Sequence, residues 1–349
     1  MPSNPRNSEG AFIKLADGTL YFAYSRYTNG SGLDDDAADI AAVLSHDDGR
    51  SWSDPVTVFK NPQMNLMSVS LLRLNNGLIA MVYLEKSAVQ GWKGFVDCRP
   101  KIVFSSDEAA TWSAPVEIAN IPAAYLVVNN DRLIQLKNGR LLLPASHHQY
   151  NSNGKLGAGI IRFFFSDDNG LSWKTNKEYI FPLPQMHNGF MEPGVIELKD
   201  GSVMCFIRTS AGCHYEAFSY DSGENWTQAI PAGEFSSPES PMSIKRDPAS
   251  GILYAVWNSR NSLYAVRAAD SKWHRTPLVM ATSADEGRTW ENHRVLEDAP
   301  DHGYCYTAMY FDGNKLHLGY CCGGAPDCRG PLADTKLCTV TIGEAEQDA

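Results

Sequence analysis

The chain has 349 residues and a mass of 38.5 kDa, and its composition, 43% hydrophobic and 20% charged, excludes a disordered or fibrous protein. The formal net charge is −10 and no run of lysine or arginine occurs, which disfavours nucleic acid and anionic membrane surfaces as partners. The ~18 consecutive apolar residues of a membrane span and the pattern of a signal peptide are both missing, so we expect a soluble protein whose compartment the sequence leaves open.

The eight cysteines predict neither a metal site nor a disulfide framework. No CxxC pair occurs, and no cysteine–histidine arrangement has the spacing of a zinc site. The adjacent residues Cys321 and Cys322 suit free thiols better than a planned set of disulfides.

A hairpin signature recurs along the chain with a period near 60 residues. Each copy has an apolar run, a turn that contains glycine, and a second apolar run. The turn glycines are separated by 59, 62, 62, 50 and 62 residues and lie at Gly18, Gly77, Gly139, Gly201, Gly251 and Gly313. Asp-Gly and Asn-Gly between alternating apolar residues are a strong hairpin signal because the turn needs positive φ angles. The sequence therefore predicts six hairpins.

A second motif, S-x-D-x-G-x-[S/T]-W, follows each of the first five hairpins. Its copies span residues 45–52, 105–112, 166–173, 219–226 and 283–290, with Ala109 in place of the glycine and Asn225 in place of the hydroxyl residue. The aspartate can accept backbone N–H groups of its own turn, the glycine permits a left-handed conformation, and the tryptophan packs the turn onto a sheet. We interpret the motif as a structural staple.

Each unit of roughly 60 residues holds about four short strands and no helical periodicity, which is typical of a four-stranded antiparallel blade. Six units predict an all-β, six-bladed β-propeller. No linker interrupts the pattern, so we expect one domain over residues 1–349. The last unit lacks the tryptophan motif, and there the chain is expected to close the ring against the N-terminal strand.

The five tryptophan motifs are Asp-boxes, and their combination with six blades resembles the sialidase (neuraminidase) superfamily of BNR-repeat propellers over essentially the whole chain. The resemblance implies an arginine triad, an acid/base aspartate, a tyrosine nucleophile and a glutamate partner near the central axis. Asp-boxes also occur in non-catalytic propellers, so each of these residues has to be sought individually.

Arg6 occupies the position that the resemblance gives to the first arginine. The family usually has Arg-Ile-Pro there, whereas this chain has Asn7-Ser8 after the arginine, followed by Glu9. A disordered terminus is the alternative interpretation of a residue so early in the chain.

The acid/base aspartate is expected in the loop after the first hairpin. Asp34, Asp35 and Asp36 lie there in a glycine-rich segment, and a general acid on a loop over the pocket suits protonation of a leaving oxygen. A solvated acidic turn explains at least two of the three, and we favour Asp34, then Asp36. Arg26 either assists the substrate carboxylate or pairs with an aspartate.

Polar residues of the third unit are further candidates for the pocket, although such residues are more often satisfied structural groups. They are Asn129, Asn130, Asp131, His147 and His148.

Glu192 and Arg208 make the best match to the family. They stand sixteen residues apart on either side of the turn at Gly201, which is similar to the family's pattern of glutamate, strand, Asp-Gly, strand and arginine. The apolar runs beside them make an unpaired charge costly, so we favour a functional interpretation over a solvated glutamate and a strand-edge arginine.

The third arginine is expected before the last Asp-box, and Arg275 lies eight residues before Ser283. Arg246 and Arg260 are the competing candidates. Three converging guanidinium groups make an anion pocket, because each can bind a carboxylate through two hydrogen bonds and stays protonated.

The nucleophile is expected on the innermost strand of the sixth unit, which offers Tyr304 and Tyr306. Tyr304 lies nine residues before Gly313, as Glu192 lies nine before Gly201, whereas Tyr306 better resembles the family's tyrosine followed by small residues. Strand alternation predicts that both tyrosines point to the same side, and either can instead be a core aromatic residue. The choice stays open.

The main hypothesis is therefore a retaining exo-α-sialidase that removes a terminal acidic sugar from a glycan without metal or organic cofactor. Sialic acid carries its carboxylate on the anomeric carbon, which would repel a carboxylate nucleophile but not a neutral phenol with a glutamate base. One alternative is a propeller glycosidase for another acidic or deoxy sugar linkage. Another is a non-catalytic carbohydrate-binding propeller. Linkage preference and oligomeric state remain open.

Overall fold

The computed structural model describes residues 4–91, 94–122, 124–151, 154–264, 275–325 and 330–342. The described chain is built of β-strands, with one short 3-10 helix, η1 (Ser262–Tyr264). The expectation of an all-β protein is confirmed. Within the described residues, no helix is long and apolar enough to cross a membrane. Seven cysteines carry free thiols, and Cys328 lies outside the described residues.

The strands follow one another in groups, and inside a group neighbouring strands pair antiparallel. The first group comprises β1 (Asn7–Lys14), β2 (Leu20–Tyr27), β3 (Ala38–Ser45) and β4 (Val56–Phe59). The second comprises β5 (Asn65–Arg73), β6 (Ile79–Ala88), β7 (Val96–Ser105) and β8 (Val116–Glu117). The third comprises β9 (Tyr125–Val127), β10 (Ile134–Gln135), β11 (Leu141–His148), β12 (Ile160–Ser166) and β13 (Lys174–Thr175). Isolated parallel pairs, Ala38 with Asn65 and Cys98 with Tyr125, join these three groups into one sheet.

The remaining groups are separate sheets. The fourth comprises β14 (Met191–Glu197), β15 (Val203–Arg208), β16 (Cys213–Ser219) and β17 (Ile230–Ser236). The fifth comprises β18 (Ser243–Arg246), β19 (Leu253–Asn258), β20 (Leu278–Ser283) and β21 (Glu291–Glu297). The sixth comprises β22 (His302–Asp312), β23 (Lys315–Gly324) and β24 (Asp334–Thr341). The expected four strands per unit are thus found in most groups, while three described strands make up the last.

Each predicted turn glycine lies between two antiparallel strands of one group and has a positive φ, from 61° at Gly313 to 92° at Gly139. The hairpin prediction is therefore confirmed. The last hairpin is tighter than the first, because Asp312 pairs directly with Lys315, whereas Lys14 pairs with Leu20.

The Asp-box segments share one set of hydrogen bonds, seen clearly at Asp285. Its Oδ1 accepts from Thr289 N at 2.9 Å, its Oδ2 accepts from Thr289 Oγ1 at 2.7 Å, and Ser283 Oγ accepts from Gly287 N at 2.8 Å. Asp47, Asp107, Asp168 and Asp221 accept from the residue four positions later in the same way. Ala109 takes the left-handed conformation (φ 66°) that glycine has in the other copies, so the substitution leaves the turn intact.

Apolar side chains fill the space between successive groups. Separate clusters lie between the first and second, second and third, third and fourth, fourth and fifth, and fifth and sixth groups. Phe12, Phe22, Ala308 and Leu337 belong to one further cluster, which lies between the first group and the last. Strands near the start of a group, such as β1 and β2, are consequently buried on both faces. Strands at the end of a group, such as β21, are largely exposed.

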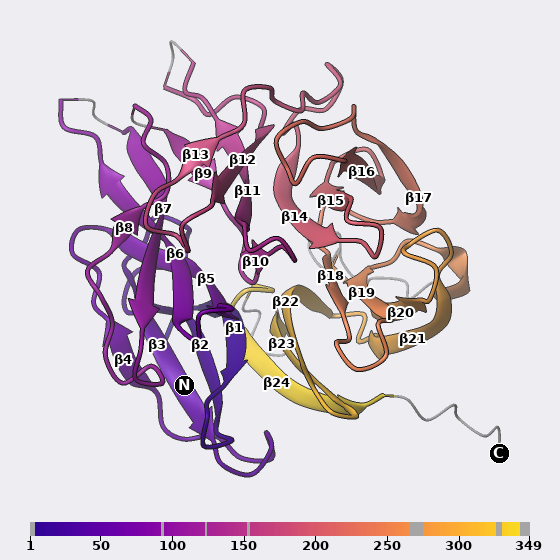
Figure 1. Ribbon diagram of the computed structural model, residues 1–349, viewed down its shortest axis with the longest axis horizontal. Coiled ribbons are helices and arrows are strands. Elements are labelled where there is room, and N and C mark those ends of the chain that lie inside the picture. Colours follow the sequence, from indigo (N-terminus) through magenta and orange to yellow (C-terminus); the bar gives the residue numbers. More distant parts are fainter. Residues whose placement is uncertain are drawn as a thin grey trace.

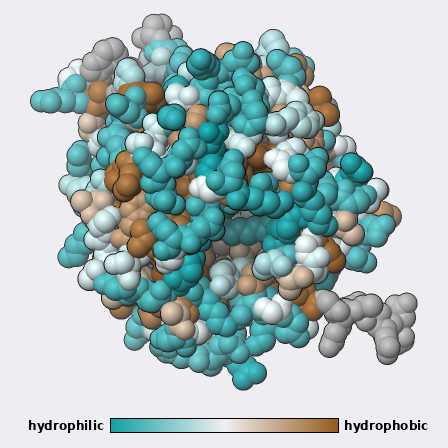
Figure 2. Space-filling view, viewed as in Figure 1, coloured by the Kyte–Doolittle hydropathy of each residue, from teal (hydrophilic) through white to brown (hydrophobic). Residues whose placement is uncertain are grey.

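The last group packs against the first as well as against the fifth. Figure 1 shows the yellow strand β24 beside the indigo strand β1, with β22 between β1 and β18. Asn7 N donates to Ala333 O at 2.9 Å, and Thr335 Oγ1 donates to Asn7 O at 2.8 Å. The start of β1 is therefore hydrogen-bonded to the start of β24. The face seen in Figure 2 is mostly hydrophilic and is hollowed near its middle.

The Asp-box geometry predicts an acid-sensitive contribution to stability. Hydrogen bonds from Thr289 lower the pKa of Asp285 from its ordinary value of 3.8 to about 2. A lowered folded-state pKa stabilises the fold above the unfolded-state value, and this stabilisation is lost as the pH falls towards 2. We expect Asp285→Ala to lower the free energy of unfolding at pH 6 and the difference from wild type to shrink towards pH 2, as measured by urea titration. Asp54→Ala, at an exposed loop aspartate, is the control, and an equal loss for both variants would contradict the staple.

Candidate active site

Four strands, β1, β5, β14 and β22, share an irregularity in pairing near their first residues. The register shifts between Ser8 and Ala11 in β1, between Met67 and Ser70 in β5, between Met191 and Gly194 in β14, and between Cys305 and Ala308 in β22. Inside each shift one residue has a left-handed backbone, and these residues are Glu9 (φ 57°), Ser68 (φ 60°), Glu192 (φ 45°) and Tyr306 (φ 59°). A bulge re-aims a side chain, and non-glycine residues with positive φ cluster at functional sites. All four residues line one cavity.

The centre of this cavity is a hydrogen bond between the predicted base and one predicted nucleophile. Tyr306 Oη donates to Glu192 Oε1 at 2.8 Å, and Arg208 Nη1 donates to Glu192 Oε2 at 2.7 Å. Arg275 lies over the phenol, with its guanidinium carbon 5.3 Å from the centre of the Tyr306 ring, and its Nη1 donates to Cys305 Sγ at 2.9 Å.

Arg6 is ordered and buried, with 2% of its surface exposed, so the alternative of a disordered terminus does not hold at this residue. Its Nη2 pairs with Glu9 Oε1 at 2.7 Å, and its Nη1 pairs with Asp34 Oδ1 at 2.5 Å. The guanidinium of Arg6 therefore already forms ion pairs with two carboxylates. Each of the three predicted arginines contacts a residue that lines the cavity. Arg6 pairs with Glu9, Arg208 pairs with Glu192, and Arg275 lies over the ring of Tyr306.

The protonation of the central pair follows from its surroundings. Burial raises the pKa of Glu192, but the guanidinium groups of Arg208 and Arg275 and the hydrogen bond from Tyr306 outweigh burial and hold that pKa below its ordinary value. Burial and the charge of Glu192 raise the pKa of Tyr306 well above its ordinary value, against the lowering effect of the two arginines. A neutral phenol therefore donates to an ionised carboxylate at neutral pH.

The three aspartates of the loop after the first hairpin, Asp34, Asp35 and Asp36, make different contacts. Asp34 lines the cavity, and its side chain is 62% exposed. Loss of water around the part of the carboxyl that faces the cavity raises its pKa, but Arg6 and Lys86 lower that pKa by more, so the net pKa is below the ordinary value. Asp35 pairs with Lys86 Nζ at 3.1 Å. Asp36 accepts from the backbone N–H groups of Ser31 and Leu33 at 2.8 and 3.0 Å, so its carboxylate holds the loop together.

The expectation that Tyr304 and Tyr306 point to the same side is wrong. The bulge between Cys305 and Ala308 breaks strand alternation, so the two rings part. Tyr304 is buried in the apolar cluster between the fifth and sixth groups, where its ring lies 6.3 Å from that of Tyr320. Tyr306 is the tyrosine that meets Glu192.

Other predicted residues have structural contacts. Arg26 is directed outward, where its Nη2 donates to Thr57 Oγ1 at 2.5 Å. Asn130 Nδ2 donates to Gly10 O at 2.7 Å and to Tyr306 O at 3.1 Å, so it ties inner strands together. Asp131 pairs with Lys245 Nζ at 2.6 Å and accepts from Met309 N at 3.0 Å.

The competing arginines lie apart from the central pair. Arg246 pairs with Glu286 at 2.7 Å, near the hairpin turns. Arg260 lines a depression together with Arg275, so it belongs to the rim on that side.

Several lining residues were missed by the sequence analysis. Glu9 and Ser68 each precede a turn glycine by nine residues, the same separation as Glu192 from Gly201, so this signal was available. Ser68 Oγ donates to Glu9 Oε2 at 2.5 Å. Lys86 is buried, its Nζ donates to Asp34 O at 2.8 Å, and it lies 5.2 Å from the centre of the Tyr125 ring. A lysine inside an apolar strand gives no such signal.

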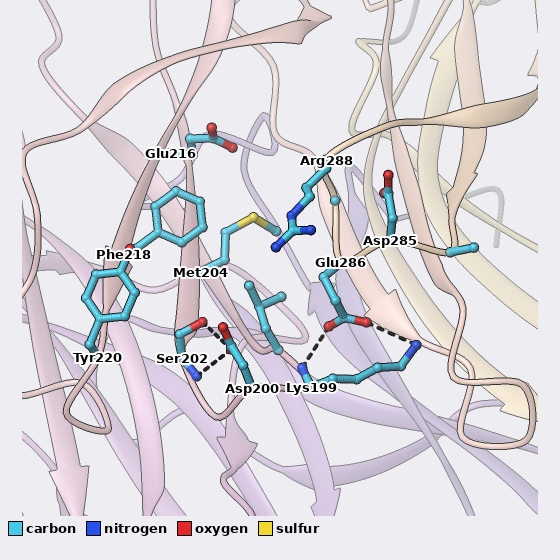
Figure 3. Close-up of a pocket in the computed structure, with 13 residues that line it drawn as sticks. Lys199, Asp200, Ser202, Met204, Glu216, Phe218, Tyr220, Asp285, Glu286 and Arg288 are labelled. Carbon is cyan, nitrogen blue, oxygen red and sulfur yellow. Dashed lines mark hydrogen bonds and ion pairs between the residues drawn. The ribbon is translucent and has the colours of Figure 1, made fainter.

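Another cavity lies at the opposite end of β14 (Figure 3). It is lined by the hairpin turn between β14 and β15 of the fourth group and by the Asp-box of the fifth group. Glu286 accepts from Lys199 N at 2.8 Å and pairs with Lys199 Nζ at 3.2 Å, and Asp200 accepts from Ser202 Oγ at 2.6 Å. These charges neutralise one another at the junction of two groups. The predicted catalytic and substrate-binding residues lie elsewhere.

The BNR repeat-like domain model matches residues 6–318. An anhydrosialidase of Macrobdella decora is 30% identical over 217 residues, which make up 59% of this chain and 27% of that protein. Among solved structures, a protein of unknown function from Dyadobacter fermentans has a TM-score of 0.74 at 20% identity and covers 97% of this chain and 95% of its own. A leech intramolecular trans-sialidase complexed with 2,7-anhydro-Neu5Ac has a TM-score of 0.71 at 15% identity, over 97% of this chain and 68% of that one.

This chain spans between 27% and 55% of the length of the curated sialidase relatives that it matches. The family model, in contrast, covers most of the chain, from the first predicted arginine to the last hairpin. The chain belongs to the BNR repeat-like domain family.

Proposed function

We propose that this chain is a sialidase-like glycoside hydrolase that removes a terminal acidic sugar with retention of configuration. The hydrogen bond between Tyr306 and Glu192, with Arg208 bonded to the glutamate and Arg275 over the phenol ring, carries the proposal. The names of the relatives, anhydrosialidase and sialidase, support the same substrate class.

We further propose that the six groups are the blades of one closed propeller domain. The apolar clusters between every pair of successive groups support it, as does the cluster that joins the last group to the first. Closure would bring the starts of β1, β5, β14 and β22 to one axis, in agreement with the shared cavity.

In the proposed mechanism, the substrate carboxylate lies against the guanidinium groups of Arg208, Arg275 and Arg6. Tyr306 Oη attacks the anomeric carbon while its proton passes to Glu192, and the bond to the leaving oxygen breaks as Asp34 donates a proton to that oxygen. Water then attacks the anomeric carbon of the glycosyl-tyrosine intermediate and gives its proton to Asp34, while the bond to Tyr306 Oη breaks and Glu192 returns its proton to the phenolate. The arginines lower the energy of the developing phenolate because they already surround the ring.

The state of Asp34 in the free site is consistent with this role only once substrate has bound. Arg6 and Lys86 keep its carboxyl ionised in the free protein. A substrate carboxylate near Arg6 offsets part of that positive charge, so binding raises the pKa of Asp34 towards the value of a working acid.

One observation favours the second candidate, a glycosidase for another acidic sugar linkage. Arg6 is already engaged by Glu9 and Asp34, which leaves less of its charge for a substrate carboxylate than in an unpaired clamp. A panel of sialosides and other acidic oligosaccharides separates the candidates, and mass spectrometry of the released sugar separates hydrolysis from the 2,7-anhydro product named for the leech relative.

The roles of the central pair predict a graded loss of activity. Glu192→Gln removes the base and should lower kcat on a fluorogenic sialoside by about 10²–10⁴-fold. Tyr306→Phe removes the nucleophile and should lower kcat at least as far. Tyr304→Phe is the matched control, since it removes a hydroxyl from the neighbouring core tyrosine, and it should leave kcat unchanged. The proposal fails if wild type is inert on every acidic sugar, or if Tyr304→Phe rather than Tyr306→Phe abolishes turnover.

The lowered pKa of Asp34 predicts an acidic activity optimum. The protonated fraction of this carboxyl falls about tenfold per pH unit above its pKa, so kcat/KM for an oligosaccharide, whose leaving alcohol needs a proton, should fall as the pH rises. An aryl sialoside, with a better leaving group, should show a shallower fall, and Asp34→Asn should remove most of the difference between the two substrates. A pH profile that is the same for both substrates in wild type would remove Asp34 from the role of acid.

A further inference from the structure

A further hollow lies beside the third group. We call it the aromatic groove and define it by Phe95, His147, His148, Tyr150, Arg162 and Tyr179. Its volume is about 920 Å³, against about 50 Å³ for the cavity around Tyr306. Pockets for drug-sized molecules have roughly 300–1,000 Å³, so the groove lies at the upper end of the range that holds a small-molecule ligand.

Tyr125 forms a common wall between the cavity and the aromatic groove. It lines the cavity, and its ring meets those of His148 and Tyr150 edge-on at 6.4 and 6.5 Å between centres. The preceding residue, Ala124, lines the groove. The cavity and the groove are therefore neighbours, separated by the ring of Tyr125.

Arg162 is the unusual residue of the groove. Only 7% of its surface is exposed, and its guanidinium carbon lies 4.8 Å from the centre of the Tyr179 ring and 5.8 Å from that of Phe164. Its Nε is buried without a hydrogen-bond partner, and over the described part of the chain no carboxylate pairs with it. A buried cation without a counter-ion is costly.

Arg140 shows what a satisfied arginine of the same group looks like. Its guanidinium also lies over a ring, 4.3 Å from the centre of Phe165, but it pairs with Asp167 at 2.7 Å and Glu224 at 3.0 Å. The carboxylates that balance Arg140 have no counterpart at Arg162.

A second polar atom of the groove is also unsatisfied. His147 Nδ1 is buried without a partner, and burial together with Arg162 lowers the pKa of His147 to about 4. The ring is therefore neutral at pH 7 and can offer a hydrogen bond beside the guanidinium. Phe95 and Tyr150, 4.5 Å apart between ring centres, add apolar faces of the kind on which sugar rings pack.

We propose that the aromatic groove binds a second anionic sugar of the substrate glycan, with its carboxylate or sulfate against Arg162, an inference that rests on the proposed function of the adjoining cavity. Arg162 supplies the counter-charge, His147 a neutral hydrogen-bonding group, and the aromatic rings a stacking surface. The preferred substrate is then a glycan with two acidic sugars, one for each site.

The kinetic test compares three substrates that share the same terminal sialic acid. One is an aryl sialoside, one has a neutral penultimate sugar, and one has an acidic penultimate sugar. Wild type should have the lowest KM for the doubly acidic substrate. Arg162→Gln should raise that KM about tenfold or more, the worth of a hydrogen-bonded charge, and leave kcat and KM for the aryl sialoside unchanged. Arg162→Lys keeps the charge and should restore part of the effect, whereas Arg140→Gln should leave the ratio of KM values unchanged.

Wild type without a preference for the doubly acidic glycan would overturn the inference, and this measurement needs no variant. An equal effect of Arg162→Gln on all three substrates would overturn it too, because it would assign Arg162 a purely structural role. A carboxylated and a sulfated penultimate sugar, tested side by side, identify which anion the groove takes.

Direct binding separates this inference from the proposed function. Isothermal titration calorimetry with the doubly acidic oligosaccharide should give a Kd that rises in Arg162→Gln and stays constant in Arg140→Gln. Binding that depends on Arg162 without any turnover would reject the hydrolase and support the groove. Turnover of sialosides with Arg162-independent binding would do the reverse.

Discussion

The hydrogen bond from Tyr306 to Glu192 depends on backbone conformations that the rest of the molecule has to enforce. Both residues stand in bulges with left-handed φ angles, which cost of order 1–3 kcal/mol each and persist only where the surroundings over-determine them. Asn130 provides part of that support, since its amide holds the carbonyl groups of Gly10 and Tyr306. The inner strands are thus stiffened by neighbours from other groups at the place where their own pairing is interrupted.

The charges of the cavity balance within a small volume. Arg6, Lys86 and Arg208 pair with Glu9, Asp34, Asp35 and Glu192, while Arg275 contacts Cys305 Sγ and the Tyr306 ring. In a chain with a net charge of −10, such pairing keeps buried cations in place without an excess field of either sign. The neutral phenol of Tyr306 is the group in the middle of this balance, and burial together with the charge of Glu192 raises its pKa well above the ordinary value.

The fold could be predicted because it depends on short-range sequence motifs. Part of the site was missed because it depends on contacts between residues that are far apart in the sequence. Asp-Gly turns and Asp-boxes are determined by residues a few positions apart, so their hydrogen bonds could be predicted from spacing alone. Glu192 and Arg208 were visible because one hairpin holds both. The bulge at Tyr306 depends on packing across several groups, and strand alternation therefore misplaced Tyr304. Lys86 and Arg162 could not be predicted for a related reason, since each lies in an apolar strand. Lys86 stands out only through its pairing with Asp35, and Arg162 only through the lack of a partner for its Nε in the tertiary structure.

The seam between Asn7 and Ala333 lies one residue away from Arg6. The proposed substrate contact at Arg6 therefore lies next to the hydrogen bonds that join the first strand to the last group, and local fraying of these bonds would loosen the guanidinium before any sheet unfolds. Under the proposed function, local opening between Asn7 and Ala333 would impair binding of the acidic sugar while most of the molecule stays folded, so activity would report on this contact more sensitively than global unfolding does.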